Sequence, residues 1–288
     1  MASINKLRSL CFPDNQKSCF ACCPPIRPSG YEHIQYQKSV QRFLRENTRQ
    51  FDPREKTIKP IIGFSCWALG YLDEDFRLIG CLLHPAVNGG EDFRHRIDFG
   101  EKCGRESCYE SKIFSILNEK QQSFWLNLTR GLDSFAYSSR KENPLFKLLN
   151  WGPRILKLIT AEETGMIFNV PSFFRTYPFF TIQVNPKAIA YILNRLINKE
   201  NIHLLKKEEF KEFFYDVLTN LNQALIQELP DEEKGEYIHQ LELDKDFLHF
   251  LRLSLKRTKM EIGQAERIKK MTDEILRHFK KDFQEKWL

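Results

Sequence analysis

The sequence predicts a mostly helical α+β protein: an N-terminal cysteine-rich domain with a β-hairpin, followed by a C-terminal helical bundle. Three observations lead to this prediction. All eight cysteines lie between Cys11 and Cys108, and residues 109–288 contain none. Two short apolar runs separated by LDED indicate a hairpin. Apolar residues that recur every three or four positions dominate the second half and indicate amphipathic helices. We therefore predict a cysteine-rich metal-binding domain over 1–112 and a helical domain over 113–288.

The composition is that of a globular protein large enough to bury a core. The chain has 288 residues, of which 42% are hydrophobic and 28% are charged, so it is neither disordered nor collagen-like. It contains no run of about 18 uncharged apolar residues, and its first residues lack the apolar stretch of a secretory signal. We expect a cytoplasmic protein without a membrane span.

The charges exclude no class of protein on their own but disfavour a nucleic-acid partner. The net charge of +6 divides evenly between residues 1–135 and 136–288. Nucleic-acid binders usually gather their cations in a patch, whereas here lysines and arginines alternate with acidic residues. Even the most basic segment, residues 252–270, contains Glu261 and Glu266, which is typical of a solvated helix face. We expect no nucleic-acid partner.

The predicted elements of the N-terminal domain could bring distant cysteines together. Prolines and glycines predict a stiff loop over 11–30, and apolar periodicity predicts a helix over 31–50. Strands are predicted near 61–71 and 76–83. If the turn is centred on Asp73 and Glu74, Cys66 and Cys81 are near partners on opposing strands. Residues 84–107 are expected to form a loop, and Cys108 is expected near a helix start.

The second half is predicted to be a helical bundle. Residues 166–184 are the exception, because aromatic and β-branched residues interrupted by prolines indicate a loop or short edge strands packed in the core. Asn185 and Pro186 are the N-cap and first residue of a helix, and four apolar stripes follow. The last helix is long and charged, and it could dock on the bundle or on a protein partner.

The cysteine spacing suggests a metal site. Two ligands separated by two residues can bind one metal because the chain reverses within that span; Cys19 with Cys22 and Cys81 with His84 have this spacing. A reducing compartment disfavours disulfides, and a single nucleophile would not account for eight thiols. We predict Zn²⁺ or a [4Fe–4S] cluster. Two four-ligand sites are an alternative, but the irregular spacing favours one site plus spare thiols. The candidate ligands are Cys19, Cys22, Cys23, Cys66, Cys81, His84, Cys103 and Cys108.

Structural roles are the alternative for several of these residues. Cys66 and Cys81 could be small buried apolar side chains in strands, and His84 could be a turn residue before Pro85. Cys11 lies outside the tight groups, and we interpret it as a core or spare thiol.

The cysteine pattern resembles that of the YkgJ-type cysteine-cluster proteins, a zinc- or iron-chelating family, over residues 11–112. Cys19, Cys22 and Cys23, in SCFACC, match the last part of that family's C-x2-C-x2-CC opening, and the remaining match is the later series Cys66, Cys81, Cys103 and Cys108. Flagellin lysine methylases in the wider group look similar in cluster layout and carry an iron–sulfur site. The resemblance therefore implies metal or cluster chelation and leaves an enzyme open.

Two other functions are kept as alternatives. The first is an enzyme, methyltransferase-like or redox, whose cleft between the two domains would be lined by Asp92, Arg94, His95 and the aromatic segment 173–180. The sequence contains neither a phosphate-binding glycine loop nor a GxSxG or HExxH motif. The second is an adaptor that binds a protein partner through its C-terminal helices and uses zinc as a structural staple.

Overall fold

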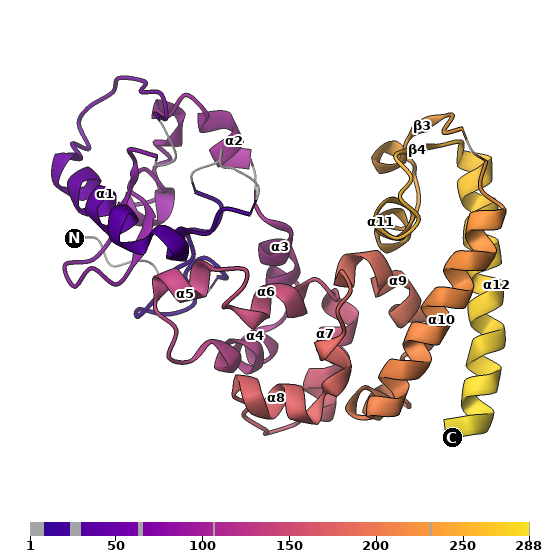
Figure 1. Cartoon of the computed structure of the whole chain (residues 1–288). Coiled ribbons are helices and arrows are strands. Elements are labelled where there is room, and N and C mark those ends of the chain that lie inside the picture. The colour runs from indigo at the N-terminus through magenta and orange to yellow at the C-terminus, as the bar shows by residue number, and fades with distance from the viewer. Residues whose placement is uncertain (1–8, 24–29, 63–65, 106, 231, 288) are drawn as a thin grey trace. The chain divides into compact units, whose positions relative to one another are not determined.

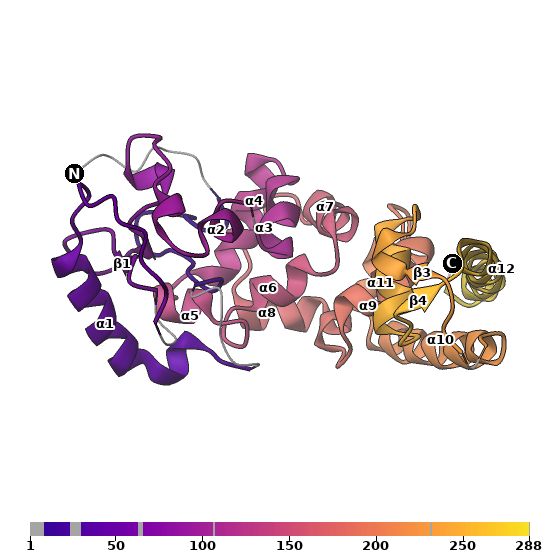
Figure 2. The ribbon, with the colours of Figure 1, turned by 90° about the horizontal axis from the view of Figure 1, so that it is seen from above.

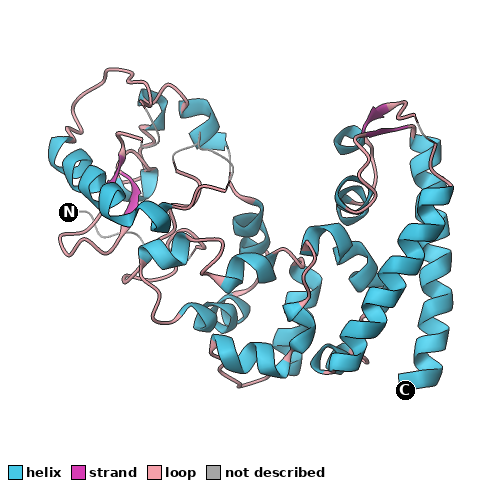
Figure 3. Ribbon diagram, viewed as in Figure 1, coloured by secondary structure: helices cyan, strands magenta, loops and turns pink. Residues whose placement is uncertain are grey.

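A computed structural model describes residues 9–23, 30–62, 66–105, 107–230 and 232–287. The chain forms two compact units, Met1–Lys147 and Leu148–Leu288 (Figure 1). Within the described residues, the strands form two sheets of two strands each, and most of the remaining regular structure is helical (Figure 3). The predicted fold class is therefore confirmed. Parts of the predicted 11–30 loop and of the first predicted strand, residues 24–29 and 63–65, lie outside the described residues.

The N-terminal unit is built of short elements around one helix and one hairpin. Helix α1 buries Val40 and Leu44 and lies alongside β1 in both views of the ribbon (Figures 1 and 2). This confirms the helix predicted over 31–50, although its first turn is a 3-10 helix. The elements are η1 (His33–Tyr36), α1 (Gln37–Gln50), β1 (Leu69–Tyr71), β2 (Ile79–Cys81), η2 (Pro85–Val87), η3 (Arg94–Arg96), α2 (Gly100–Arg105), α3 (Tyr109–Ser115), α4 (Glu119–Leu126), η4 (Asn127–Thr129), α5 (Ser134–Ser138) and α6 (Pro144–Leu149).

The predicted hairpin is present, but its register differs from the prediction. Strands β1 and β2 are antiparallel, and Cys81 lies opposite Leu69 rather than opposite Cys66. The turn is longer than expected because the Asp73 carboxylate accepts hydrogen bonds from the backbone N–H groups of Arg77 and Leu78, at 2.9 and 2.7 Å. These bonds keep residues up to Leu78 in the turn, so that the second strand begins only at Ile79. Cys66 therefore precedes the strand and is not a cross-strand partner of Cys81.

The N-terminal unit continues beyond the boundary predicted at residue 112. The backbone N–H groups of Ser18 and Phe20 each donate 3.0 Å hydrogen bonds to the hydroxyls of Ser134 and Ser138, respectively. These residues begin and end α5, so this helix belongs with the cysteine-rich loop. The boundary between the two units falls within α6, between Lys147 and Leu148.

The C-terminal unit is a helical assembly with an aromatic core. Asn185 caps α9 through a 3.1 Å bond to the Lys187 N–H, and Pro186 is the first helical residue, as the sequence predicts. Its elements are α7 (Pro153–Glu162), α8 (Val170–Thr176), η5 (Pro178–Thr181), α9 (Pro186–Leu196), η6 (Ile202–Lys206), α10 (Glu208–Gln227), β3 (Glu236–Tyr237), η7 (Ile238–Gln240), α11 (Lys245–Leu253), β4 (Lys259–Met260) and α12 (Ile262–Trp287).

The prediction of a loop or edge strands over 166–184 is wrong, because this segment contains α8 and η5. Asn169 and Ser172 form a capping box, in which each side chain bonds the backbone N–H of the other. This pair starts a helix despite the β-branched and aromatic residues that favour strands. The core position of its aromatic residues is confirmed, since Phe173, Phe179 and Phe180 are buried.

The long C-terminal helix α12 packs inside its own unit. Its buried residues Ala265, Ile268, Thr272 and Leu276 recur every three or four positions, and the helix lies against α10 and α9 (Figure 1). The sequence left open whether this helix docks on the bundle or on a protein partner. In the structure it docks on the bundle. Among the described residues, none of the helices combines the length and apolarity needed to cross a bilayer.

We predict that Tyr177→Phe lowers the free energy of unfolding by about 1–3 kcal/mol. The Tyr177 hydroxyl donates a 2.7 Å bond to the buried carboxylate of Glu163, which also pairs with Lys206 at 2.7 Å. Phenylalanine would leave this carboxylate, which is only 7% exposed, with one partner fewer. Urea unfolding followed by circular dichroism measures the change. The control is Tyr215→Phe, whose hydroxyl accepts an exposed bond from Gln183, and a loss as large in the control would contradict this account.

Candidate metal centre

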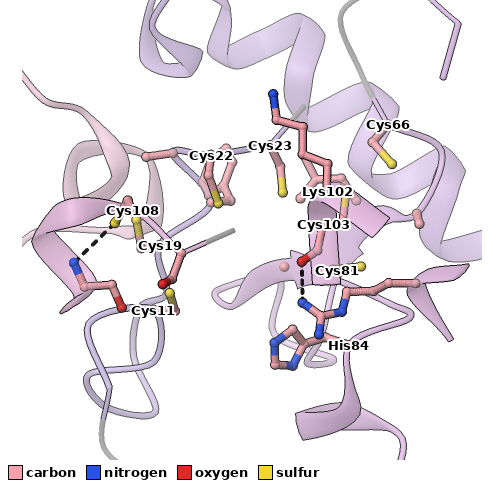
Figure 4. A pocket seen from close by; sticks show the side chains of 18 of the residues that line it. Cys11, Cys19, Cys22, Cys23, Cys66, Cys81, His84, Lys102, Cys103 and Cys108 are labelled. Carbon is pink, nitrogen blue, oxygen red and sulfur yellow. Dashed lines mark hydrogen bonds between the residues drawn. The ribbon is translucent and has the colours of Figure 1, made fainter. Parts of the chain in front are cut away.

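All eight cysteines line one cavity in the N-terminal unit (Figure 4). The cavity has a volume of about 430 Å³, and its cysteines come from the N-terminal loop, the hairpin, α2 and the start of α3. Apolar side chains such as Phe20 and Ile97 also line it, as do three cationic residues, Arg94, Lys102 and Arg140. Cysteine thiols are thus the most numerous reactive groups in a cavity wall that is otherwise largely apolar.

The N-terminal loop folds back on itself to bring Cys11 beside Cys19. The Asp14 carboxylate accepts bonds from the N–H groups of Gln16 and Lys17, at 2.8 and 3.1 Å, which reverses the chain. The Cys19 N–H then donates a 2.8 Å bond to the Cys11 carbonyl. Sequence analysis set Cys11 apart as a core or spare thiol, but the structure places it in the cavity wall. The Pro-Asp-Asn turn sequence was the signal for this reversal.

The next part of the loop is fixed by the buried hydroxyl of Ser18. This oxygen donates to the Ile79 carbonyl at 2.7 Å and accepts from the Ile79 N–H at 2.6 Å. It therefore joins the loop to β2 through one side chain that bonds both backbone groups of Ile79. A tight turn follows, in which the Cys23 N–H donates a 2.9 Å bond to the Phe20 carbonyl. The turn presents Cys22 and Cys23 to the cavity.

The hairpin and the helices beyond it supply the remaining thiols. The Cys66 carbonyl accepts bonds from the Leu69 N–H and the Asn47 side-chain amide, both at 3.0 Å. Cys81 is the last residue of β2. Cys103 lies in α2, where a loop was predicted, and its carbonyl accepts a 2.6 Å bond from the Arg94 guanidinium (Figure 4).

Cys108 caps α3, as expected for a residue at a helix start. Its sulfur accepts a 3.3 Å bond from the Ser111 N–H (Figure 4). Backbone N–H groups at a helix N-terminus stabilise negative charge, and this bond lowers the pKa of Cys108. Burial of the sulfur outweighs the bond, so the pKa of the Cys108 thiol is raised above its usual value.

Burial keeps most of the thiols neutral. It raises the pKa of Cys11 and of Cys81 to about 12 and the pKa of Cys66 to about 11. The pKa of Cys19 is also raised well above its usual value, mainly by burial. Protonated thiols are poor nucleophiles, so these residues do not suit covalent catalysis. A metal that binds them must release their protons.

His84 acts as a helix cap. Its Nδ1 atom accepts a 3.1 Å bond from the Ala86 N–H at the start of η2, and burial lowers the pKa of the imidazole. A neutral ring whose Nδ1 accepts a hydrogen bond carries its proton on Nε2. In this arrangement neither ring nitrogen offers a free lone pair, so we leave His84 out of the ligand set developed below.

The residues suggested for an enzymatic cleft have structural roles. Asp92 forms a 2.6 Å ion pair with Arg94, which strongly lowers the pKa of Asp92, to about 2. Phe173, Tyr177 and Phe180 are buried in the core of the C-terminal unit. The Asp92 carboxylate is thus engaged by Arg94, and these aromatic side chains are used in packing.

Comparison with known proteins yields no relative. No protein-family model matches the chain, and no curated protein or solved structure matches it. Within the part of the chain that the structure describes, no three His, Cys, Asp or Glu side chains come together as closely as a single metal ion requires. The similarity to the YkgJ-type family and the metal ligands both stay predictions.

We predict that Gly100→Ala destabilises the protein by about 1–3 kcal/mol, as overpacking does. A Cβ atom at Gly100 would overlap the Arg94 carbonyl oxygen and lie 2.7 Å from the His95 Cα atom, forcing α2 away from η3. Gly104, one turn later in the same helix, has open space around it. Gly104→Ala is therefore the matched control and should be neutral or slightly stabilising. Thermal unfolding of the two variants compares them, and equal stabilities would contradict the close approach at Gly100.

Proposed function

We propose that the N-terminal unit binds an iron–sulfur group through cysteine thiolates and serves electron transfer or redox chemistry. The observation that carries this proposal is the convergence of eight cysteines, from separate parts of the chain, on one cavity. Iron–sulfur clusters are held by cysteine thiolates. A protein that needed cysteine only as a small apolar side chain would have no reason to direct every one of them to the same space.

The absence of disulfides among the cysteines, all of which lie in the described part of the chain, supports ligation over disulfide bonding. Only Cys66 is buried as fully as a core residue, while Cys22 is exposed. Thiols gathered at this density without disulfides are the usual arrangement of a metal or cluster site in a reducing compartment.

The size of the cavity favours a cluster over zinc. In a zinc site four thiolates surround one ion at about 2.3 Å, which leaves no open volume between them. The cavity has about 430 Å³. The thiolates of a [4Fe–4S] cluster each bind a different iron at a corner of the cube, so they stand farther apart and enclose more space. Zinc as a structural staple is the second metal that the donor set allows.

The first prediction of this function is that the protein purified without air is brown. We expect broad absorption near about 400 nm and equal amounts of iron and acid-labile sulfide, with about four of each per cluster. Metal analysis by plasma mass spectrometry, together with a sulfide assay, measures this. A protein that stays colourless after anaerobic incubation with iron and sulfide would contradict the proposal, and a content of zinc alone would replace it with a structural metal site.

A further inference from the structure

The eight thiols divide into two groups of four. The loop set consists of Cys11, Cys19, Cys22 and Cys108, and the hairpin set consists of Cys23, Cys66, Cys81 and Cys103. In Figure 4 the loop set lies to the left of the cavity and the hairpin set to the right. We infer that each set is a separate ligand site and that the chain holds two clusters side by side. This inference rests on the proposed iron–sulfur function.

Every pair of thiols in the loop set lies within electrostatic reach. Cys19 interacts with Cys11, Cys22 and Cys108. Cys11 interacts in turn with Cys22 and Cys108, and Cys108 interacts with Cys22. The backbone bond from Cys19 to Cys11, at 2.8 Å, fixes one edge of this group. Four thiols within electrostatic reach of one another supply the number of ligands that one [4Fe–4S] cluster takes.

The thiols of the hairpin set are also linked by electrostatic interactions. Cys23 interacts with Cys66 and Cys81, and Cys81 interacts with Cys66 and Cys103. Cys66 also interacts with Cys103. The bond from the Leu69 N–H to the Cys66 carbonyl holds Cys66 at the start of β1, where Leu69 lies opposite Cys81. The Arg94 bond to the Cys103 carbonyl joins α2 to the segment that carries Arg94.

The adjacent residues Cys22 and Cys23 connect the two sets. Their thiols share a hydrogen bond, which together with burial raises the pKa of Cys23 well above its usual value. Side chains of neighbouring residues leave the backbone in different directions, so one residue of the pair can serve each set. In two-cluster ferredoxins a cysteine of one sequence motif likewise ligates the other cluster. The vicinal pair therefore places the two sites next to each other.

Each set also has its own arginine. The Arg140 guanidinium lies within electrostatic reach of Cys19 and Cys108, and it forms a 2.8 Å ion pair with the buried Glu110. The Arg94 guanidinium lies within reach of Cys81 and Cys103. Four thiolates around a cluster carry excess negative charge, and a nearby cation compensates it in a largely apolar wall. The two arginines, one within reach of each set, fit two sites better than one.

Paired variants test the division. The double variant Cys11→Ser, Cys19→Ser removes half of the loop set, and Cys66→Ser, Cys81→Ser removes half of the hairpin set. After anaerobic reconstitution we expect about eight irons per wild-type chain and about four in each double variant. Loss of all iron in either variant, or about four irons in the wild type, would show a single shared site and overturn the division.

A measurement on the wild-type protein covers the case in which a variant does not fold. Dithionite reduction should give an electron paramagnetic resonance signal of two spins per chain, split by interaction between neighbouring clusters. One unsplit spin per chain would overturn the inference. Protein that takes up no iron would contradict the proposed iron–sulfur function and not the division itself. Two zinc ions per chain would support the division into two ligand sites and would contradict only the identity of the bound metal.

We predict that Arg94→Gln lowers the reduction potential of one cluster and leaves the other unchanged. Removing the cation near Cys81 and Cys103 makes added negative charge less favourable at the hairpin set only. A redox titration followed by paramagnetic resonance separates the two clusters. Arg54→Gln is the control, because this arginine is exposed and paired with Asp52. Equal shifts of both potentials would contradict the separate placement of the arginines.

Discussion

The arrangement of the thiols depends on the buried hydroxyl of Ser18. This one oxygen bonds both backbone groups of Ile79 in β2, while the Ser18 N–H bonds the hydroxyl of Ser134 in α5. The loop, the hairpin and α5 therefore meet at a single buried point. Leaving any of these buried groups without a partner costs about 1–3 kcal/mol. Three cysteines of the loop follow Ser18 within five residues, so their position relative to Cys66 and Cys81 is set by these bonds.

The serine bonds hold together the backbone segments that carry the thiols of the loop and the hairpin. A buried core stands behind the hairpin, in which Leu44, Leu69, Ile79 and Phe135 pack together. Neutral thiols add little repulsion to this arrangement, because burial raises their pKa values. On the proposed function, binding a cluster would exchange these protons for iron. The largely apolar wall limits the access of water to the more buried sulfurs, and such shielding is one of the factors that set a cluster's potential.

The sequence predicts elements whose signals are local. The period of apolar residues finds α1 and the helices after Asn185, and the LDED run finds the hairpin. The register of the hairpin was missed because the carboxylate bonds of Asp73 lengthen the turn. The helix α8 was missed because a capping box outweighs the strand preference of the residues around it. Both errors arise where a side chain bonds the backbone, an effect that periodicity does not contain.

From the sequence we could predict that the cysteines gather, but not how they are arranged within the cavity. Spacing alone suggested one site with spare thiols and left Cys11 outside it. The inferred division into two sets depends on which thiols lie within electrostatic reach of one another although they are far apart in sequence, such as Cys19 with Cys108 and Cys66 with Cys103. No local sequence pattern contains this information. The predicted domain boundary failed to include α5 for the same reason, since its serines bind the loop more than 100 residues earlier.

Iron K-edge X-ray absorption of the anaerobically reconstituted protein tests the central claim most directly, because it reports the atoms bound to iron. The account predicts a first shell of sulfur alone and a second shell of iron, as in a cluster held entirely by cysteine. A first shell containing nitrogen or oxygen, or the absence of an iron neighbour, would contradict it.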